Sequence, residues 1–321
     1  MGVFKIKDVV TDLTGKDLIT TQEWSVDEIR LALELARDIK KRYIFYGVNG
    51  IPKLLERKTF FMLFFAPSTR TRSAFEAAMT LLGGHAQYLE PRMTRAGEGE
   101  ALKDIAKMYE RYGHGLGIRI LDKAIDYVYG RGNVVIRETA KWAKVPVINM
   151  ADDMFHPTQG LADYLTFEEA FPKPRGKKYV IMWAYSPEIR GWCSIQEDLL
   201  IFTKATGASL EFSNDFKAAV EGAHAVFPRN WASPKLVQVG YSKFAEEERR
   251  LYEKFRDWRV SRELFDRMDK SAVLMHVMPI FRGYEADEDV IDSPRSLLYE
   301  QAENGLYTKA AVLALTMAGM K

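Results

Sequence analysis

Hydrophobic positions along the chain follow two alternating spacings. Continuous hydrophobic runs of strand length recur between segments in which hydrophobic residues return every three or four positions. The runs cover residues 59–65, 115–120, 145–150, 179–184, 223–227 and 272–276. The helical spacing covers residues 25–41, 72–82, 101–112, 159–170, 194–206 and 302–317, and the first of these opens with the capping-box pair Ser25 and Glu28. This alternation predicts an α/β protein in which helices cover parallel sheets.

Length and composition indicate two ordinary globular domains. The 321 residues are 47% hydrophobic and 28% charged, which excludes collagen-like and disordered classes. At about 100–200 residues per domain, this length predicts two domains. Residues 171–178 contain two prolines and a glycine, and we place a domain boundary near this break. The formal net charge is only +2, so the total predicts no broad basic surface for nucleic acid.

Several residue counts bear on compartment and metal binding. The single cysteine, Cys193, cannot form an intramolecular disulfide, which favours a reducing compartment. The first residues lack the hydrophobic core of a signal peptide, and no hydrophobic run approaches the roughly 20 residues that span a bilayer. We therefore expect a cytoplasmic protein that makes no membrane contact. The five histidines show no short metal-ligand spacing, so we expect no metal.

The segment after the first hydrophobic run has an anion-binding pattern. Residues 67–72 read Pro-Ser-Thr-Arg-Thr-Arg and directly precede a predicted helix. The first N–H groups of a helix are unpaired and lie at the positive end of its dipole, and hydroxyls and guanidiniums add donors that match a phosphate. An ordinary helix cap with solvent-facing arginines is the alternative for this segment alone. No Gly-x-x-x-x-Gly-Lys precedes it, so it is not a Walker loop.

A second pattern follows the hydrophobic run at 145–150. Residues 156–159 read His-Pro-Thr-Gln at the start of another predicted helix, where α/β folds present side chains to a ligand. A histidine and a glutamine there can donate to a carbonyl oxygen and accept from an amide. Taken alone, this pattern is equally typical of a structural histidine.

Together these motifs resemble the aspartate/ornithine carbamoyltransferase family. The matching segments are residues 68–76, 83–86, 156–163, 276–279 and 301–304, with a strand that ends in Arg119, and they follow the family order over nearly the whole chain. The resemblance implies two doubly wound parallel-sheet domains. Residues 1–150 would bind carbamoyl phosphate and be completed by the C-terminal helix at 300–321, and residues 151–299 would bind the amino acceptor.

The resemblance also implies roles for individual residues. Ser68, Thr69, Arg70 and Thr71 would hold the phosphate, with Arg95 reaching in from a neighbouring subunit of a homotrimer or a multiple of trimers. Arg119, His156 and Gln159 would hold the carbamoyl group, and Asn149, Arg229, Ser233, Met278 and Arg282 would form the acceptor site. The reaction needs no cofactor, because fixed donors aimed at the carbonyl oxygen and the departing phosphate lower the barrier.

Departures from the family pattern fall in the acceptor half. Arg229 stands where ornithine enzymes carry an acidic residue that pairs with the α-amino group, and a cation repels an ammonium. Residues 276–279 read His-Val-Met-Pro in place of His-Cys-Leu-Pro, although the Met278 carbonyl could still accept from an amine. Gly305 replaces the arginine usual after Ala-Glu-Asn, and Arg282 is a candidate replacement. After the helix predicted to end near Gly207, such a domain should enter a strand and a long loop, but the chain passes straight to residues 208–212 and a short helix.

Two hypotheses follow from these matches and departures. In the first, the protein transfers the carbamoyl group of carbamoyl phosphate to an amino group of ornithine or a related acceptor. Arg229 then favours an acceptor whose α-nitrogen is acylated or absent, or one with an extra carboxylate. In the second, the protein is a non-catalytic carbamoyl-phosphate-binding or regulatory paralogue of the same fold, which the changes at Val277 and Gly305 would allow.

Overall fold

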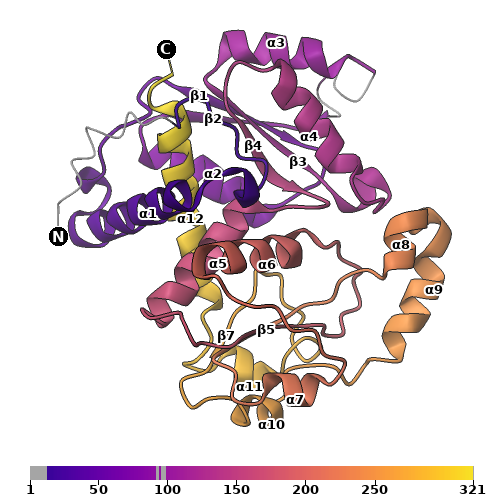
Figure 1. The fold of residues 1–321 in the computed structure, drawn as a ribbon. Coiled ribbons are helices and arrows are strands. Elements are labelled where there is room, and N and C mark those ends of the chain that lie inside the picture. The colour runs from indigo at the N-terminus through magenta and orange to yellow at the C-terminus, as the bar shows by residue number, and fades with distance from the viewer. Residues whose placement is uncertain (1–12, 92–93, 95–98, 321) are drawn as a thin grey trace.

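Two parallel β-sheets with flanking helices organise the molecule (Figure 1). The computed structural model describes residues 13–91, 94 and 99–320. In that part of the chain the first sheet has the strand order β2-β1-β3-β4 and the second has the order β5-β6-β7, with parallel neighbours throughout. The predicted α/β class with parallel sheets is confirmed.

The first sheet is built on a strand that is buried on both faces. Its strands are β1 (Thr59–Phe64), β2 (His85–Leu89), β3 (Gly115–Ile120) and β4 (Val147–Asp152). Its helices are α1 (Val26–Tyr46), α2 (Thr69–Leu81), α3 (Leu102–Tyr112) and α4 (Arg131–Trp142). Phe60 and Met62 pack in one hydrophobic cluster and Phe61 and Leu63 in another, so β1 needs an uninterrupted hydrophobic run.

The second sheet is smaller. Its strands are β5 (Tyr179–Met182), β6 (Ala225–Pro228) and β7 (Val273–Leu274). Around it lie α5 (Pro157–Ala170), α6 (Cys193–Thr206), α7 (Phe216–Val220), α8 (Pro234–Val239), α9 (Tyr241–Glu253), α10 (Arg262–Asp266) and α11 (Glu288–Ile291). Val226, Leu274 and Phe265 contribute to a core of its own.

The last helix, α12 (Leu298–Met317), connects the two halves (Figure 1). It leaves the second sheet, runs beside α5 and packs against α1 and α2 of the first. Most of its residues from Tyr307 to Met317 are fully buried, which explains why this helix is hydrophobic almost all round. Among the described residues, no helix combines the length and the apolar character that crossing a membrane requires.

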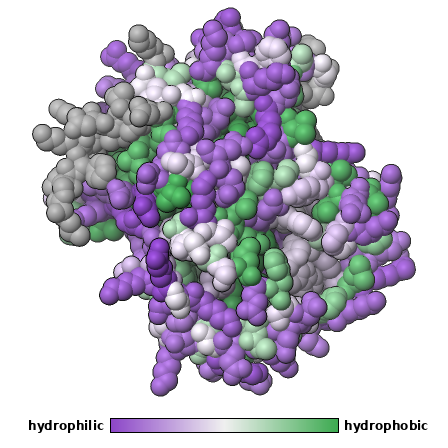
Figure 2. All heavy atoms as spheres, in the orientation of Figure 1, coloured by the Kyte–Doolittle hydropathy of each residue, from purple (hydrophilic) through white to green (hydrophobic). Residues whose placement is uncertain are grey.

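One edge of the second sheet is open. No described strand pairs with the outer edge of β5, and residues 207–215 run past it as an irregular segment in which Phe212 is 83% exposed. A groove of about 1670 Å³ lies between this edge, α6 and the loop. Figure 2 shows hydrophobic residues over the middle of the half that contains the second sheet. Because residues 207–215 form no strand, the outer edge of β5 has no neighbouring strand among the described residues.

Candidate active site

The N-terminus of α2 forms a cradle of donors at the carboxyl end of β1. Ser68 is the N-cap residue, and its Oγ accepts from the backbone N–H of Thr71 at 3.2 Å. Thr71 is buried, whereas Thr69 and Arg70 are exposed. Arg72 turns away, since its guanidinium lies 3.7 Å from the ring centroid of Tyr88 and bonds Glu76 at 3.0 Å. The cradle therefore presents the hydroxyls and Arg70, but not Arg72.

Arg119 lies at the end of β3 with part of its guanidinium unused. Its Nη1 is 3.4 Å from the carbonyl oxygen of Met150, and its buried Nε has no hydrogen-bond partner among the described residues. Burial lowers the pKa of Arg119, and the nearby charge of Arg70 lowers it further. A buried donor without a partner is costly, so the geometry suits a bound acceptor at this point.

His156 and Gln159 begin α5 at the carboxyl end of β4. His156 is buried, and its Nδ1 has no partner in the described part of the chain. Burial, together with the charges of Arg119, Lys309 and Arg229, holds its pKa well below the ordinary value, so the imidazole is neutral at pH 7. The side-chain amide of Gln159 donates to Asp163 Oδ1 at 2.7 Å, which fixes its orientation.

Two buried carboxyl groups lie where α5, α6 and α12 pack together. Asp163 on α5 also accepts from Gln301 on α12 at 2.6 Å, and Asp198 on α6 accepts from the Tyr179 hydroxyl at 3.2 Å. Burial raises the pKa of Asp163 to about 6 and raises that of Asp198 well above its ordinary value. Because burial favours the protonated form of Asp198, α5, α6 and α12 can meet here with less repulsion between the two neighbouring carboxyl groups.

Arg229 faces the same cluster from the second sheet. It follows β6, and its Nε and Nη1 are buried without partners among the residues that the structure describes. Burial and then the charge of Arg190 lower its pKa to about 10, so it stays protonated. Asp122 and Cys193 raise the pKa of both Arg229 and Arg119, so both guanidiniums lie within electrostatic range of the same two groups. The carboxyl ends of the two sheets thus converge, as expected for ligand sites in α/β folds.

A buried ionic network that the sequence did not predict holds the loops on this side. Arg190 pairs with Glu285 in a double contact and donates to the carbonyl oxygen of Pro279 at 2.9 Å. Glu285 also accepts from the N–H of Phe281 at 2.7 Å and lies 3.4 Å from His276 Nε2. Burial lowers the pKa of His276 to about 4. Arg190 and Glu285 are 95 positions apart, so no local pattern could have paired them.

Comparisons with known proteins identify the family of this chain. Residues 16–169 match the family model described as aspartate/ornithine carbamoyltransferase, carbamoyl-P binding domain, and residues 187–316 match its Asp/Orn binding domain. The chain belongs to the aspartate/ornithine carbamoyltransferase family. The anabolic ornithine carbamoyltransferase of Pyrococcus furiosus is 35% identical over 336 residues, covering 98% of this chain and 100% of that protein.

Solved structures of carbamoyltransferases show the same fold. The ornithine carbamoyltransferase from Pyrococcus furiosus superposes with a TM-score of 0.80 at 32% identity, covering 97% of this chain and 100% of that one. A mutant N-acetyl-L-ornithine transcarbamylase, complexed with carbamyl phosphate and N-succinyl-L-norvaline, gives a TM-score of 0.82 at 27% identity, covering 93% and 99%. The composition break at residues 171–178 lies between the two family-model matches, the first of which ends at residue 169 and the second of which begins at residue 187.

Four other residues predicted for the acceptor site of this carbamoyltransferase are engaged within the protein. The buried Asn149 amide donates to the Ile19 carbonyl at 2.8 Å, and Ser233 caps α8 while its hydroxyl donates to Glu248 at 2.5 Å. Arg282 forms a double ion pair with Asp292 at 2.7 and 2.8 Å on the surface. The backbone N–H of Met278 donates to His276 Nδ1 at 2.8 Å. Their roles toward an acceptor stay predictions, and Arg95 lies outside the described residues.

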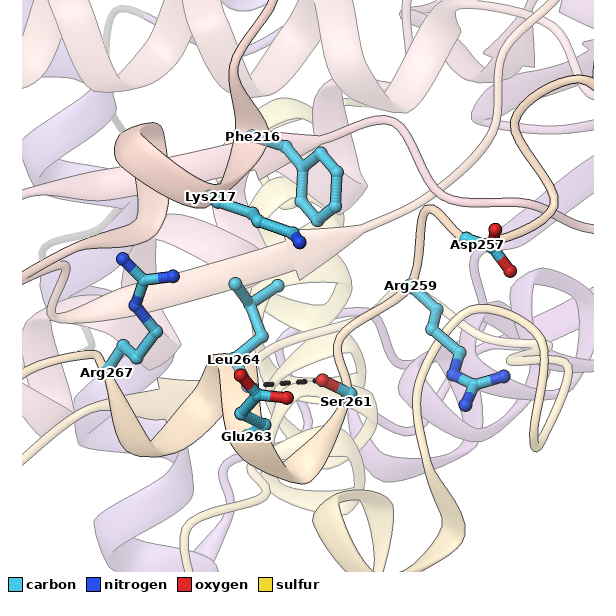
Figure 3. A pocket seen from close by; sticks show the side chains of 8 residues that line it. All are labelled: Phe216, Lys217, Asp257, Arg259, Ser261, Glu263, Leu264 and Arg267. Atoms are coloured by element: carbon cyan, nitrogen blue, oxygen red, sulfur yellow. Dashed lines mark hydrogen bonds between the residues drawn. The ribbon is translucent and has the colours of Figure 1, made fainter.

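A separate shallow hollow of about 250 Å³ lies on the second half of the molecule (Figure 3). Phe216 faces it from α7, and Ser261, the N-cap of α10, accepts from the N–H of Leu264 at 3.1 Å. Its arginines already have acidic partners, since Arg259 pairs with Asp287 and Arg267 with Glu221. This hollow shares no residue with the cluster around Arg119 and His156.

Proposed function

We propose that this carbamoyltransferase moves the carbamoyl group of carbamoyl phosphate to the amino group of an amino-acid-type acceptor and releases phosphate. The observation that carries the proposal is that Arg119, His156 and Arg229 each have a buried nitrogen without a partner among the described residues, within electrostatic range of one another or of Arg70 in the α2 cradle. These residues end or follow strands of both sheets, on the side of the carboxyl ends. Buried donors without partners are the arrangement expected around an anionic substrate.

The residues suit the charge changes of this reaction. The neutral amine attacks the carbonyl carbon, a C–N bond forms, and negative charge develops on the carbonyl oxygen, where Arg119 and His156 supply donors. The C–O bond to phosphate then breaks, and Ser68, Thr69, Arg70 and the N–H groups of α2 bind the leaving phosphate. The amine proton is released to the phosphate or to solvent. The chain supplies positioning and electrostatic stabilisation rather than a covalent nucleophile.

Arg229 supports an acceptor without a free α-ammonium. A guanidinium in a partly desolvated site repels an ammonium and attracts a carboxylate or an acyl oxygen. The relative solved with N-succinyl-L-norvaline shows that this fold can hold an N-acylated amino acid. We therefore favour an N-acylated or additionally anionic acceptor over free ornithine.

Two further features of the proposal rest on the resemblance and on composition. The protein would act as a homotrimer or a multiple of trimers in which Arg95 reaches a neighbouring phosphate site. The buried free thiol of Cys193 supports a reducing compartment, and we propose the cytoplasm.

A phosphate-release assay with saturating carbamoyl phosphate tests the function. The acceptors are the amines ornithine, N-acetylornithine, N-succinylornithine and putrescine and the amide oxamate, and each is assayed with the parent and with Arg229→Gln. We expect turnover of an N-acylated or anionic acceptor, and we expect kcat/KM for ornithine relative to that acceptor to rise about tenfold or more in Arg229→Gln. Binding of carbamoyl phosphate without turnover of any amine would support the non-catalytic alternative.

A further inference from the structure

Lys309 is a buried cation that the reaction described above does not use. It lies on α12, is 3% exposed, and donates from Nζ to the carbonyl oxygen of Gly305 at 3.1 Å. An ammonium has three donors. In the part of the chain that the structure describes, no carboxylate oxygen lies within 4.0 Å of Nζ. A buried charge with so few partners is unfavourable unless a ligand completes its surroundings.

The position of this ammonium is set by the glycine one helical turn earlier. A β-carbon built on Gly305 would lie 3.3 Å from Lys309 Nζ, so a side chain at 305 would enter the space that the ammonium occupies. Residues four apart share one face of a helix. The Phe75 ring lies 5.6 Å from Nζ and covers the lysine from α2. Lys309 is therefore held between α12 and the helix that carries the phosphate cradle.

The charge of Lys309 acts on the groups predicted to hold the carbamoyl group. It lowers the pKa of His156, and the charge of Arg119 in turn lowers the pKa of Lys309. Burial is the larger cause and brings the pKa of Lys309 to about 8. Both neighbours have a buried nitrogen without a partner among the described residues, His156 Nδ1 and Arg119 Nε. Lys309 therefore lies within electrostatic range of two groups that each keep a buried donor or acceptor free.

We propose that Lys309 binds the donor substrate by donating a hydrogen bond to the carbonyl oxygen of carbamoyl phosphate, beside Arg119 and His156. The inference rests on the proposed function and assigns a ligand contact to a residue that sequence patterns did not single out. Its cation would compensate for the missing arginine at Gly305 from the same face of α12. Arg282 is a poorer replacement because its guanidinium is already paired with Asp292 at the surface.

The alternative role for Lys309 is a counter-ion for Asp163. Asp163 raises the pKa of Lys309, but its hydrogen bonds come from Gln159 and Gln301 instead. A counter-ion would support folding without discriminating between ligands. A donor to the carbonyl oxygen would act on carbamoyl phosphate far more than on inorganic phosphate, which lacks that oxygen.

Titration calorimetry with carbamoyl phosphate and with inorganic phosphate separates these roles. The variants are Lys309→Met, which keeps much of the side-chain length, Lys309→Ala, and the double variant Gly305→Arg/Lys309→Ala, which returns a cation to the same helix face. Lys40→Met is the matched control, because Lys40 bonds Asn304 of α12 at 2.8 Å and Glu169 at 2.7 Å away from the cluster. Thermal melting of each variant reports folding independently.

We expect Lys309→Met and Lys309→Ala to weaken carbamoyl phosphate binding about tenfold or more, the loss typical of a charge-assisted hydrogen bond. Phosphate binding should change less than about threefold, and the double variant should recover most of the lost affinity. Lys40→Met should lower the melting temperature without changing either affinity. Equal affinities in the parent and both Lys309 variants, or equal losses for both ligands without rescue, would overturn the assignment. A parent that does not bind carbamoyl phosphate would instead overturn the proposed function, and this inference with it.

Discussion

Two arginines of α2, two positions apart, have different surroundings and should behave differently. Arg70 is exposed at the cradle, whereas Arg72 is held by Glu76 and the Tyr88 ring. Because a guanidinium contributes a charge-assisted bidentate contact to phosphate, we expect Arg70→Gln to raise the Kd for carbamoyl phosphate about 10- to 100-fold. Arg72→Gln should change it less than about threefold. Calorimetry on both variants decides the matter, and equal effects would contradict the cradle geometry.

His156 should act mainly in the transition state. Its imidazole is neutral in the folded protein, so it can donate one hydrogen bond to a developing oxyanion. We expect His156→Ala to lower kcat about 10²–10³-fold while the Kd for carbamoyl phosphate changes much less. The parent's kcat should also show no inflection near pH 6.5 from this residue, because its pKa lies well below that value. An unchanged kcat in the variant would remove His156 from the mechanism.

Sequence patterns located candidate site residues that lie close together along the chain. Ser68, Arg70 and Thr71 occupy one helix start, and the structure places them there. Arg190 and Glu285 were not predicted, because a pair 95 positions apart leaves no local pattern. Lys309 lies in a helical stretch that is hydrophobic almost throughout, where a lone lysine gives no signal until its burial is known.

At the scale of elements, Glu197 joins α6 to the segment before α1. It is fully buried, and its carboxyl accepts from the backbone N–H of Thr21 at 2.9 Å and from the hydroxyls of Thr20 and Thr21. Opposite it, Gly160 of α5 approaches so closely that an added β-carbon would lie 2.8 Å from Glu197 Cγ. This crowded junction raises the pKa of Glu197 to about 7, chiefly through burial.

The raised pKa makes stability depend on pH. Between about pH 4.5 and 7 the unfolded chain loses the Glu197 proton while the folded chain keeps it, so the free energy of unfolding falls as the pH rises. Between pH 5 and 7.5, the free energy of unfolding of the parent should fall by about 2–3 kcal/mol more than that of Glu197→Gln. Calorimetric melting across this range measures it, with Glu34→Gln on the exposed face of α1 as the control. Parallel pH profiles for the parent and Glu197→Gln would disprove the assignment.

The elements that sequence predicted are those with two buried faces or one strong hydrophobic stripe. β1, β3 and β4 lie within two residues of their predicted bounds, because buried parallel strands are hydrophobic throughout. β2 was not predicted, since its residues are half-buried or exposed and include His85 and Gln87. The short helices α8, α10 and α11 also escaped prediction, because four to six residues carry too little periodicity to recognise.

For the whole molecule, the two sheets differ in size and in how well their edges are covered. The first sheet has a fully covered central strand, whereas the second is bounded by the open edge of β5 and by the two-residue strand β7. The carbonyls of Lys178 and Met182 face β6, where they accept at 3.2 and 2.9 Å, so the intervening Tyr179 and Ile181 present their backbone groups to the groove. The proposed function requires both sheets, because Arg119 ends a strand of one and Arg229 follows a strand of the other.

This inequality predicts that the second sheet opens first. Local stability follows the amount of buried apolar surface and the number of protected backbone hydrogen bonds, and both are smaller around β5 than around β1. In native-state hydrogen exchange followed by mass spectrometry, we expect peptides covering β5 and β6 to exchange about 10²-fold faster than those covering β1 and β3. Peptides from the buried part of α12, which packs on the first sheet's helices, should share the slower rate. Uniform protection across both sheets would contradict this prediction. It would show that α12 and the α5–α6 junction couple the two sheets into one unfolding unit despite the open edge of β5.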